Sequence, residues 1–217
     1  NVTPLEMGWE KAIQKNIQKT DAVISLLPQT MHVPVAKYCI ENKTPLVTAS
    51  YMSDEMKTLD NKAKEAGIPI LCELGLDPGM DHMSAMKIID EIKDQGGKVT
   101  SFSSVCGGLP EAATNPFGYN FSWSPKGVLM ALMNEAKYLK EGKIIHVAGS
   151  DLLKHAEKTN IDSLPQYDFE VLPNRNAISY RDIYGISEHV ENLFRGTLRY
   201  KGFSSIMHDF KKVGLLE

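Results

Sequence analysis

The segment that most constrains the fold joins a short apolar run to an amphipathic helix through a turn rich in glycine, aspartate and proline. The apolar run is 68–72, the turn is 74–82, and apolar residues recur at a helical period over 83–92. Such a run predicts a strand buried in a parallel sheet. Ligands of these sheets bind beyond the carboxyl ends of the strands, where this turn falls. The turn therefore predicts either a ligand-binding loop or an ordinary strand-to-helix connection.

Residues of the turn have predicted local roles. Asp77, which precedes Pro78, is a suitable cap for the helix that follows. Gly75 and Gly79 lack side chains, so a ligand could approach the backbone closely there.

The first 78 residues alternate between strand and helix patterns. Apolar runs at 22–27, 46–49 and 68–72 predict strands, and periodic segments at 10–19, 34–42 and 53–67 predict helices. Ser53 is the expected cap of the last of these helices, and Gly67 its expected end. Short connections of this kind produce right-handed crossovers and a parallel sheet.

Beyond residue 79 strands and helices no longer alternate one for one. Strands are predicted at 98–104, 144–148, 169–172 and 192–200, helices at 124–133 and 203–213, a loop at 106–110 and an irregular stretch up to Pro116. The sequence thus predicts two parts: 1–78, the α/β part, and 79–217, an α+β domain.

Composition excludes several classes of protein. The 217 residues carry a net charge of −3 without a basic block, which argues against nucleic acid as a partner. No apolar run approaches the roughly 20 residues that span a membrane. The three cysteines are too scattered for a disulfide framework or a zinc site, so we expect no metal and a reducing compartment. The chain begins at Asn1 without a visible targeting peptide, which predicts a fragment.

A glycine-rich G-x-G-x-x-G turn, which normally opens a dinucleotide-binding sheet, does not occur in these residues. The predicted parallel strands therefore correspond to the later half of such a sheet. On its own, this chain is expected to bind nucleotides poorly.

Residues at the carboxyl ends of the three predicted parallel strands meet at one sheet edge. They are 27–28, 49–51 and 76–78. His32 follows Pro28 closely and is a candidate proton carrier at that edge, although a surface or capping role is the favoured alternative. Asp81 and His82 suggest a carboxylate-oriented base, with ordinary first-turn residues again favoured.

In the second part, arginines suggest a site for carboxylates. Along a strand Arg195, Thr197 and Arg199 share a face, and a guanidinium binds a carboxylate through two parallel hydrogen bonds. The favoured alternative is a solvated face with weak surface ion pairs. Cys106 is either an exposed thiol or, as favoured, a buried small residue.

Six motifs occur in a fixed order along nearly the whole chain. They are VISLLP at 23–28, LVTASY at 46–51, ELGLDPGMDH at 73–82, CGGLP at 106–110, FSWSP at 121–125 and RGTLRYKG at 195–202. In these motifs the chain resembles the saccharopine dehydrogenase (L-glutamate-forming) family, which includes fungal saccharopine reductase and the dehydrogenase half of animal and plant α-aminoadipic semialdehyde synthase.

The resemblance implies the later half of a Rossmann-type sheet followed by an α+β domain for substrate binding and dimerisation. It implies an oxidoreductase of lysine metabolism that uses NAD or NADP to convert saccharopine to glutamate and α-aminoadipate semialdehyde. A homodimer is expected, in the cytoplasm or, for an animal bifunctional enzyme, the mitochondrion. The alternatives are a non-catalytic substrate-binding and oligomerisation core, and a relative that acts on another imino acid.

The resemblance also implies site residues. The implied cofactor contacts are Leu27, Ala49, Ser50, Tyr51, Leu76 and Pro78. The implied substrate contacts are Ser50, Tyr51, Asp77, Arg175 and the backbone of Gly196, Thr197 and Leu198. Asp77 is the leading candidate for proton transfer and Cys106 a weaker one. Arg175 is followed by Asn176 and Ala177 where the family usually has Asp-Ser, so its neighbours differ.

Overall fold

The computed structural model describes residues 8–111 and 119–216. The chain divides into two compact units, Asn1–Ser84 and Ala85–Glu217. Most of the stretch predicted to be irregular before Pro116 lies outside the described residues. Among the described residues, no helix is both long and apolar enough to cross a membrane.

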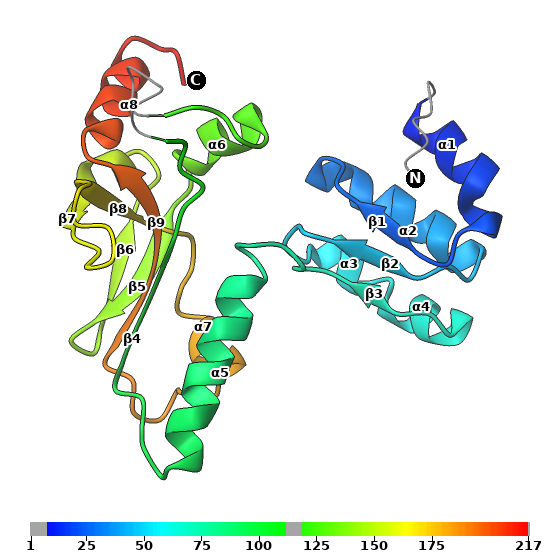
Figure 1. Cartoon of the computed structure of the whole chain (residues 1–217), viewed down its shortest axis with the longest axis horizontal. Helices are drawn as coiled ribbons and strands as arrows, with labels where there is room; N and C mark the ends of the chain where they lie inside the picture. Colours follow the sequence, from blue (N-terminus) through cyan, green and yellow to red (C-terminus); the bar gives the residue numbers. More distant parts are fainter. Residues whose placement is uncertain (1–7, 112–118, 217) are drawn as a thin grey trace. The chain divides into compact units, whose positions relative to one another are not determined.

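The first unit contains a three-stranded parallel sheet in the order β1-β2-β3 (Figure 1). Its elements are α1 (Trp9–Asn16), β1 (Val23–Ser25), α2 (His32–Glu41), β2 (Leu46–Thr48), α3 (Asp54–Lys57), α4 (Asp60–Ala66) and β3 (Ile70–Leu71), with 3-10 turns η1 (Ile17–Lys19) and η2 (Gln29–Met31). The predicted order and parallel pairing are confirmed. The predicted helix over 53–67 is divided into α3 and α4.

Local end signals in this unit act as the sequence predicts. The Ser53 hydroxyl accepts a hydrogen bond from the Met56 amide at 3.2 Å and caps α3. Gly67 closes α4 with a φ of 71°, a conformation that glycine adopts without a steric penalty.

The sheet of the first unit has one covered and one uncovered face. Leu46 and Thr48 of β2 are buried on the face that packs against the helices. On the other face, Ile24 is 70% exposed and Leu71 is 47% exposed, with Val47 between them in register. We call Ile24, Val47 and Leu71 the uncovered sheet face. The prediction of fully buried strands is therefore wrong for this face, because no described element packs on it.

The glycines of the turn allow the chain to approach itself. Gly75 and Gly79 form a bridge, and the Gly75 amide donates to the Pro78 carbonyl at 2.9 Å. A Cβ on Gly79, whose φ is +147°, would lie 2.2 Å from the Gly75 carbonyl oxygen. The space predicted for a ligand is thus filled by the turn's own backbone. The carboxylate of Asp81, rather than that of Asp77, binds the Gly79 amide at 2.8 Å.

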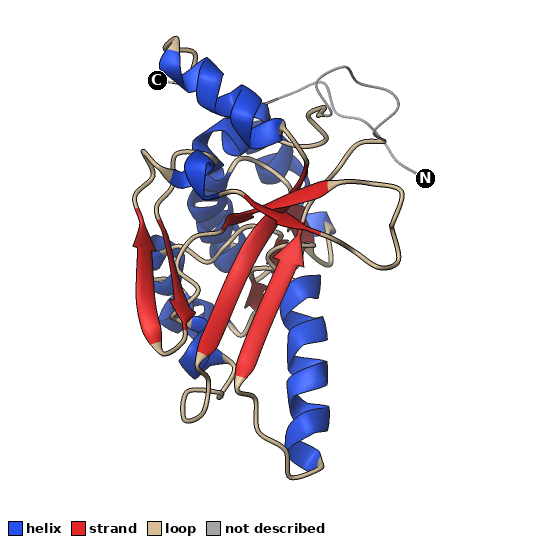
Figure 2. Ribbon diagram, turned by 90° about the vertical axis from the view of Figure 1, so that its left-hand side faces the viewer, coloured by secondary structure: helices blue, strands red, loops and turns tan. Residues whose placement is uncertain are grey.

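The second unit contains a six-stranded sheet in which β9 is central. Figure 2 draws the strands in red. Its elements are α5 (Met80–Asp94, which begins in the first unit), β4 (Ser101–Cys106), α6 (Pro125–Ala131), β5 (Ala136–Lys140), β6 (Lys143–Val147), η4 (Leu152–His155), β7 (Glu157–Thr159), β8 (Phe169–Pro173), α7 (Tyr180–Ile183), β9 (Asn192–Tyr200) and α8 (Phe203–Lys212). All strand pairs are antiparallel except β4 with β9. The predicted α+β architecture is confirmed.

Two strands of this unit, β5 and β7, escaped prediction because they are short and carry lysines that interrupt the apolar alternation. The opposite error concerns β9. Arg195 is 2% exposed and Arg199 is 4% exposed, so the favoured reading of a solvated arginine face is wrong. Aromatic rings take the place of solvent there: Arg195 lies over Tyr180, with its guanidinium carbon 4.4 Å from the ring centroid.

Candidate functional site

The sheet edge of the first unit joins the end of β2 to the turn after β3. The Glu73 amide donates to the Ser50 carbonyl at 3.0 Å, and the Leu74 amide donates to the Thr48 carbonyl at 3.1 Å. These bonds hold Tyr51 beside the turn, where its hydroxyl donates to Asp77 Oδ1 at 2.7 Å. The edge therefore brings together the Tyr51 phenol and the Asp77 carboxylate from two different loops, with Ser50 next to Tyr51 in the chain.

A buried histidine lies behind this edge. His32, at the start of α2, is only 3% exposed. Its Nδ1 is 2.9 Å from the Ser25 hydroxyl, and its Nε2 is 2.8 Å from the Ser50 hydroxyl and 3.0 Å from that of Thr48. The favoured reading of a surface or capping histidine is therefore wrong. We call Ser25, His32, Thr48 and Ser50 the hydroxyl–histidine cluster.

The hydroxyl–histidine cluster favours the neutral form of the His32 ring. Burial lowers the pKa of His32 from its ordinary value of 6.5. Both ring nitrogens have hydroxyl partners, so the neutral ring is satisfied without a carboxylate. The ring thereby fixes the hydroxyl of Ser50, one of the predicted contact residues.

The residues predicted to contact a cofactor differ in accessibility. Leu76 is 54% exposed, whereas Pro78 is buried. Leu27 is half-buried and packs against the core of the first unit. Ala49 lies beneath the turn, with its Cβ 3.1 Å from where a Cβ on Gly75 would stand. Leu76, Ser50 and Tyr51 are thus brought to the edge, while Leu27 and Pro78 serve mainly to pack it.

His82 lies between two acids on the same turn. Its Nε2 is 3.6 Å from Glu73 Oε2, and its Nδ1 is 3.7 Å from Asp81 Oδ2. Glu73 also accepts the Met52 amide at 3.0 Å. The Asp81 carboxylate already accepts the Gly79 amide at the start of α5. We therefore interpret Glu73, Asp81 and His82 as residues that stabilise the turn rather than as a catalytic base.

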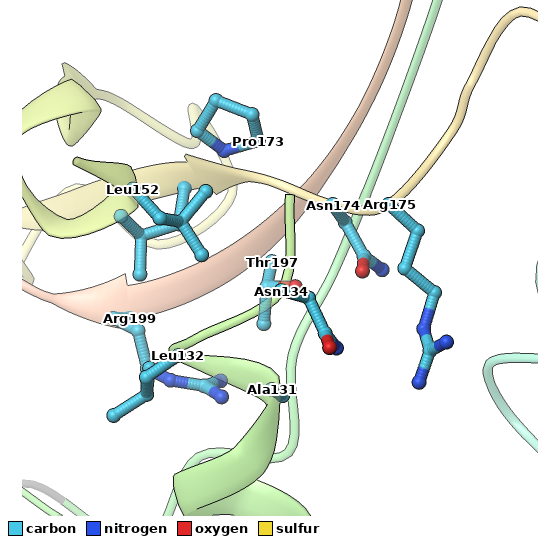
Figure 3. A pocket seen from close by; sticks show the side chains of 10 residues that line it. Ala131, Leu132, Asn134, Leu152, Pro173, Asn174, Arg175, Thr197 and Arg199 are labelled. Carbon is cyan, nitrogen blue, oxygen red and sulfur yellow. The ribbon is translucent and has the colours of Figure 1, made fainter. Parts of the chain in front are cut away.

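The second unit contains a small cavity of about 20 Å³ between β8, β9 and the segment after α6 (Figure 3). It is lined by Ala131, Leu132, Asn134, Leu152, Leu172, Pro173, Asn174, Arg175, Thr197 and Arg199. One water molecule needs about 10–15 Å³ measured this way, so the cavity admits a small polar group. Of the predicted substrate contacts, Arg175 and Thr197 line it, whereas Gly196 and Leu198 do not.

Arg199 is the most enclosed cation at this cavity. Its guanidinium lies over two rings, with the guanidinium carbon 5.3 Å from the centroid of Tyr119 and 5.1 Å from that of Phe203. One terminal nitrogen donates to the Leu198 carbonyl at 2.8 Å, and Nε has no hydrogen-bond partner in the described part of the chain. Burial lowers the pKa of the Arg199 guanidinium below its ordinary value.

The nearest acid across the sheet does not neutralise Arg199. Glu170 is its partner in register, yet the Glu170 carboxylate accepts the amides of Gly202 and Ser204 at 3.0 and 2.6 Å. No ion pair joins Glu170 to Arg199 in the described residues. Desolvating a charge costs several kcal/mol, and each cation–π contact returns about 0.5–2 kcal/mol. The rings therefore offset only part of the cost, and an anion at the cavity would supply more.

The other predicted residues of this unit are placed as follows. Arg175 is exposed, with a φ of 51° that is uncommon outside glycine, and its carbonyl accepts the Lys137 amide at 2.9 Å. Cys106 is half-buried at the end of β4, opposite Thr197. Cys106 is thus neither fully exposed nor fully buried, so neither of the two predictions for it is met. Leu198 is 8% exposed, and its carbonyl is bound by Arg199.

Several functional candidates were missed from sequence. Ser25 and Thr48 are hydroxyls inside apolar strands, a pattern that signals a buried polar cluster. Asn134 and Asn174 carry no such signal, because only the tertiary fold brings them to the cavity. In the described ranges, no group of three or more His, Cys, Asp or Glu residues is placed to hold a metal ion.

Comparison with known proteins places the chain in context. The profile described as "Saccharopine dehydrogenase C-terminal domain" matches residues 75–217, and the one described as "Saccharopine dehydrogenase NADP binding domain" matches residues 4–71. The Arabidopsis thaliana "Alpha-aminoadipic semialdehyde synthase" is 48% identical over 98% of this chain and 20% of its own length. The Saccharomyces cerevisiae "Saccharopine dehydrogenase [NADP(+), L-glutamate-forming]" is 45% identical over 98% of this chain and 48% of its own length.

A solved structure agrees with these sequence relationships. The apo, histidine-tagged saccharopine dehydrogenase (L-Glu forming) from Saccharomyces cerevisiae has a TM-score of 0.84 and 44% identity. The match covers 96% of this chain and 47% of that one, so the chain spans about half the length of its fungal relatives. With both of its units matched in order and its fold reproduced, the chain belongs to the saccharopine dehydrogenase family.

Proposed function

We propose that the full-length protein containing this chain is a saccharopine dehydrogenase that forms L-glutamate. Saccharopine, NAD(P)+ and water would give L-glutamate, α-aminoadipate semialdehyde, NAD(P)H and a proton. The observation that carries the proposal is the Tyr51–Asp77 hydrogen bond of 2.7 Å at the edge of a parallel sheet, in a chain of this family. The names of the fungal relatives, which state NADP and L-glutamate, support it.

The reaction removes a hydride from the saccharopine carbon beside the secondary amine and leaves a carbon–nitrogen double bond. Water then adds to that carbon, the carbon–nitrogen bond breaks, and the nitrogen leaves as the amine of glutamate. At least three proton transfers are needed: one from the secondary amine before the hydride leaves, one from the attacking water and one to the departing nitrogen. Asp77 is our candidate for accepting and returning a proton, and the Tyr51 hydroxyl orients its carboxylate. Cys106 remains a weaker candidate for proton transfer.

The residues at the sheet edge fit the nicotinamide end of a dinucleotide. Leu26 is 80% exposed, Leu76 54% and Leu74 47%, so apolar side chains are available to cover a planar ring. Ser50 and Tyr51 add polar groups at the same edge. When bound, NAD(P) supplies the hydride acceptor. Phosphate binding would depend on a glycine-rich turn outside these residues.

The cavity of the second unit suits a substrate with several carboxylates. Arg175 lines it from an exposed position, where a guanidinium can capture a carboxylate from solution. Thr197 adds a hydroxyl at its wall. Gly196 and Leu198 remain proposed backbone contacts. The remaining proposed contacts are those of the sheet edge, Ser50, Tyr51 and Asp77.

The test is an assay of the full-length protein with saccharopine and each nicotinamide cofactor, followed by the formation of reduced cofactor. Asp77→Asn should lower kcat by about 100-fold, since one general acid–base group contributes at least this much. Asp60→Asn, at an exposed position of α4, is the matched control and should keep wild-type kcat. Arg175→Ala should raise the KM for saccharopine with little change in the KM for the cofactor.

Two outcomes would overturn the proposal. If the protein binds saccharopine but does not oxidise it with NAD+ or NADP+, a non-catalytic binding core is favoured. If it oxidises only a different imino acid, saccharopine is not its substrate. An unchanged kcat in Asp77→Asn would remove Asp77 from proton transfer.

We also propose a homodimer and a cytoplasmic location, with the mitochondrion as the alternative. The edge strand β6 supports self-association, because its Ile144 side chain is 60% exposed and a sheet edge offers unpaired backbone groups. The relatives from mouse and rat are named mitochondrial, which supports the alternative compartment. Sedimentation of the full-length protein and fractionation of the source cells test these two points.

A further inference from the structure

Arg199 is a buried cation with no anion beside it in the described residues. The side chain is 4% exposed, Nε has no hydrogen-bond partner among residues 8–111 and 119–216, and the guanidinium forms part of the wall of the cavity (Figure 3). Its terminal nitrogen that binds the Leu198 carbonyl fixes the side chain's direction. A group that is both charged and held in place marks a site prepared for a ligand of opposite charge.

The rest of the cavity wall supports an anion rather than a cation. Asn134, Asn174 and Thr197 offer hydrogen-bond donors, and Arg175 adds a second positive charge. Among the residues that the structure describes, no aspartate or glutamate lines the cavity. Apolar side chains such as Leu132 and Leu152 complete the wall and exclude water, which strengthens an ionic contact. A carboxylate is small enough to be the incoming group.

We propose that Arg199 binds a carboxylate of the substrate, with Asn174 and Asn134 beside it, and is a second anchoring arginine besides Arg175. The identity of the ligand as saccharopine rests on the proposed function. The two arginines have different tasks. Arg175 is exposed and meets the substrate in water, whereas Arg199 is enclosed between aromatic rings and holds a carboxylate that has left water.

The enclosed position of Arg199 predicts a specific dependence on salt. Ionic strength screens exposed charges and affects buried pairs much less. The loss of affinity in Arg175→Gln should therefore shrink as salt is added, because salt already weakens that contact in the wild type. The loss in Arg199→Gln should stay nearly constant over the same range.

The experiment uses the full-length protein with Arg199→Gln and Arg199→Lys. Arg199→Gln should raise the KM for saccharopine about 10- to 100-fold, the range for a hydrogen bond to a charged group. The KM for the cofactor should not change. Arg199→Lys keeps the charge without the planar fork and should recover part of the affinity. It also serves if the glutamine variant does not fold.

Arg181→Gln is the matched control. Arg181 also has an unpartnered Nε, but it is half-buried on α7 and does not line the cavity. Its replacement should leave the KM for saccharopine at the wild-type value. An unchanged KM in folded Arg199→Gln and Arg199→Lys would overturn the inference while leaving the proposed function intact.

A second measurement separates this inference from the proposed function. The unfolding temperature is recorded with L-glutamate and L-α-aminoadipate, and with L-glutamine as a ligand with one carboxylate fewer. The dicarboxylates should raise it more than glutamine in the wild type, and this difference should vanish in Arg199→Gln. If this pattern appears in a protein without saccharopine turnover, the carboxylate site stands and the proposed function fails. Equal shifts in wild type and variant would refute the site.

Discussion

The two units each bury one titratable side chain near the candidate site, and they treat it in opposite ways. In the first unit, His32 is surrounded by the hydroxyls of Ser25, Thr48 and Ser50, so both ring nitrogens are satisfied within the protein. In the second unit, Arg199 has aromatic rings around it and an Nε that meets no hydrogen-bond partner in the described part of the chain. A fully satisfied buried group stabilises the fold and fixes its neighbours. A partly satisfied charge weakens the fold and favours a ligand.

The largest expected change in the free energy of unfolding comes from removing the imidazole of the hydroxyl–histidine cluster. His32→Leu leaves two buried hydroxyls, those of Ser25 and Thr48, and the half-buried hydroxyl of Ser50 without their common partner, and each unsatisfied buried group costs about 1–3 kcal/mol. We expect the free energy of unfolding of the full-length protein to fall by roughly 3 kcal/mol, measured by chemical denaturation. His155→Leu, on η4 of the second unit, is the control. A loss no larger than that of the control would mean that the cluster does not stabilise the fold.

The opposite sign is expected at Arg199. Replacing a buried ion pair by apolar side chains of similar volume is often neutral or stabilising by about 1–4 kcal/mol, and removing the desolvation cost of one unpaired charge acts in the same direction. Loss of two cation–π contacts reduces this gain, so Arg199→Met should change the unfolding free energy by about +1 kcal/mol without ligand. Saturating L-glutamate should reverse the order and leave the wild type more stable. A variant that loses several kcal/mol without ligand would show that Arg199 is structural.

A single hydroxyl sharpens the first half of the comparison. Ser25→Ala removes the partner of His32 Nδ1 and should lower the free energy of unfolding by about 1 kcal/mol, measured as for His32→Leu. Ser25 is not itself a predicted contact residue, whereas Ser50 is, so kinetic constants should change less in Ser25→Ala than in Ser50→Ala. If Ser25→Ala and Ser50→Ala lowered the kinetic constants equally, the whole cluster, and not Ser50 alone, would determine the geometry of the sheet edge.

The smallest effect concerns pH. Burial lowers the pKa of His32, so the folded protein favours the neutral ring more than the unfolded chain does. The stabilisation from the neutral ring is fully present above the ordinary pKa of 6.5 and is lost as the pH falls through the lowered value. The unfolding free energy of the wild type should decline over that acid range more steeply than that of His32→Gln. Parallel curves would contradict the assignment.

Local patterns predicted the fold well where each residue's role depends on its neighbours in sequence. Ser53 caps the start of α3 and Gly67 ends α4, as expected. The parallel arrangement of β1, β2 and β3 followed from the short crossover connections. Strand β5 was missed because its stability comes from pairing with β6 and β9 rather than from its own composition.

The candidate site was predicted in part for the same reason. Tyr51 and Asp77 meet because strand ends share an edge, which sequence order reveals. The burial of His32 and Arg199 was mispredicted, since the hydroxyls and aromatic rings that enclose them come from distant segments. Polar residues within apolar strands, such as Ser25 and Thr48, are the signal that would have corrected the first error.

The uncovered sheet face has a practical consequence for handling these 217 residues on their own. Ile24 at 70% exposure, together with half-buried Val47 and Leu71 at 47%, presents adjacent apolar side chains to water. Such a surface favours aggregation as the protein concentration rises. Light scattering should therefore increase with added sulfate, which strengthens apolar association. Lysine in place of Ile24 should keep the sample clear at higher concentration.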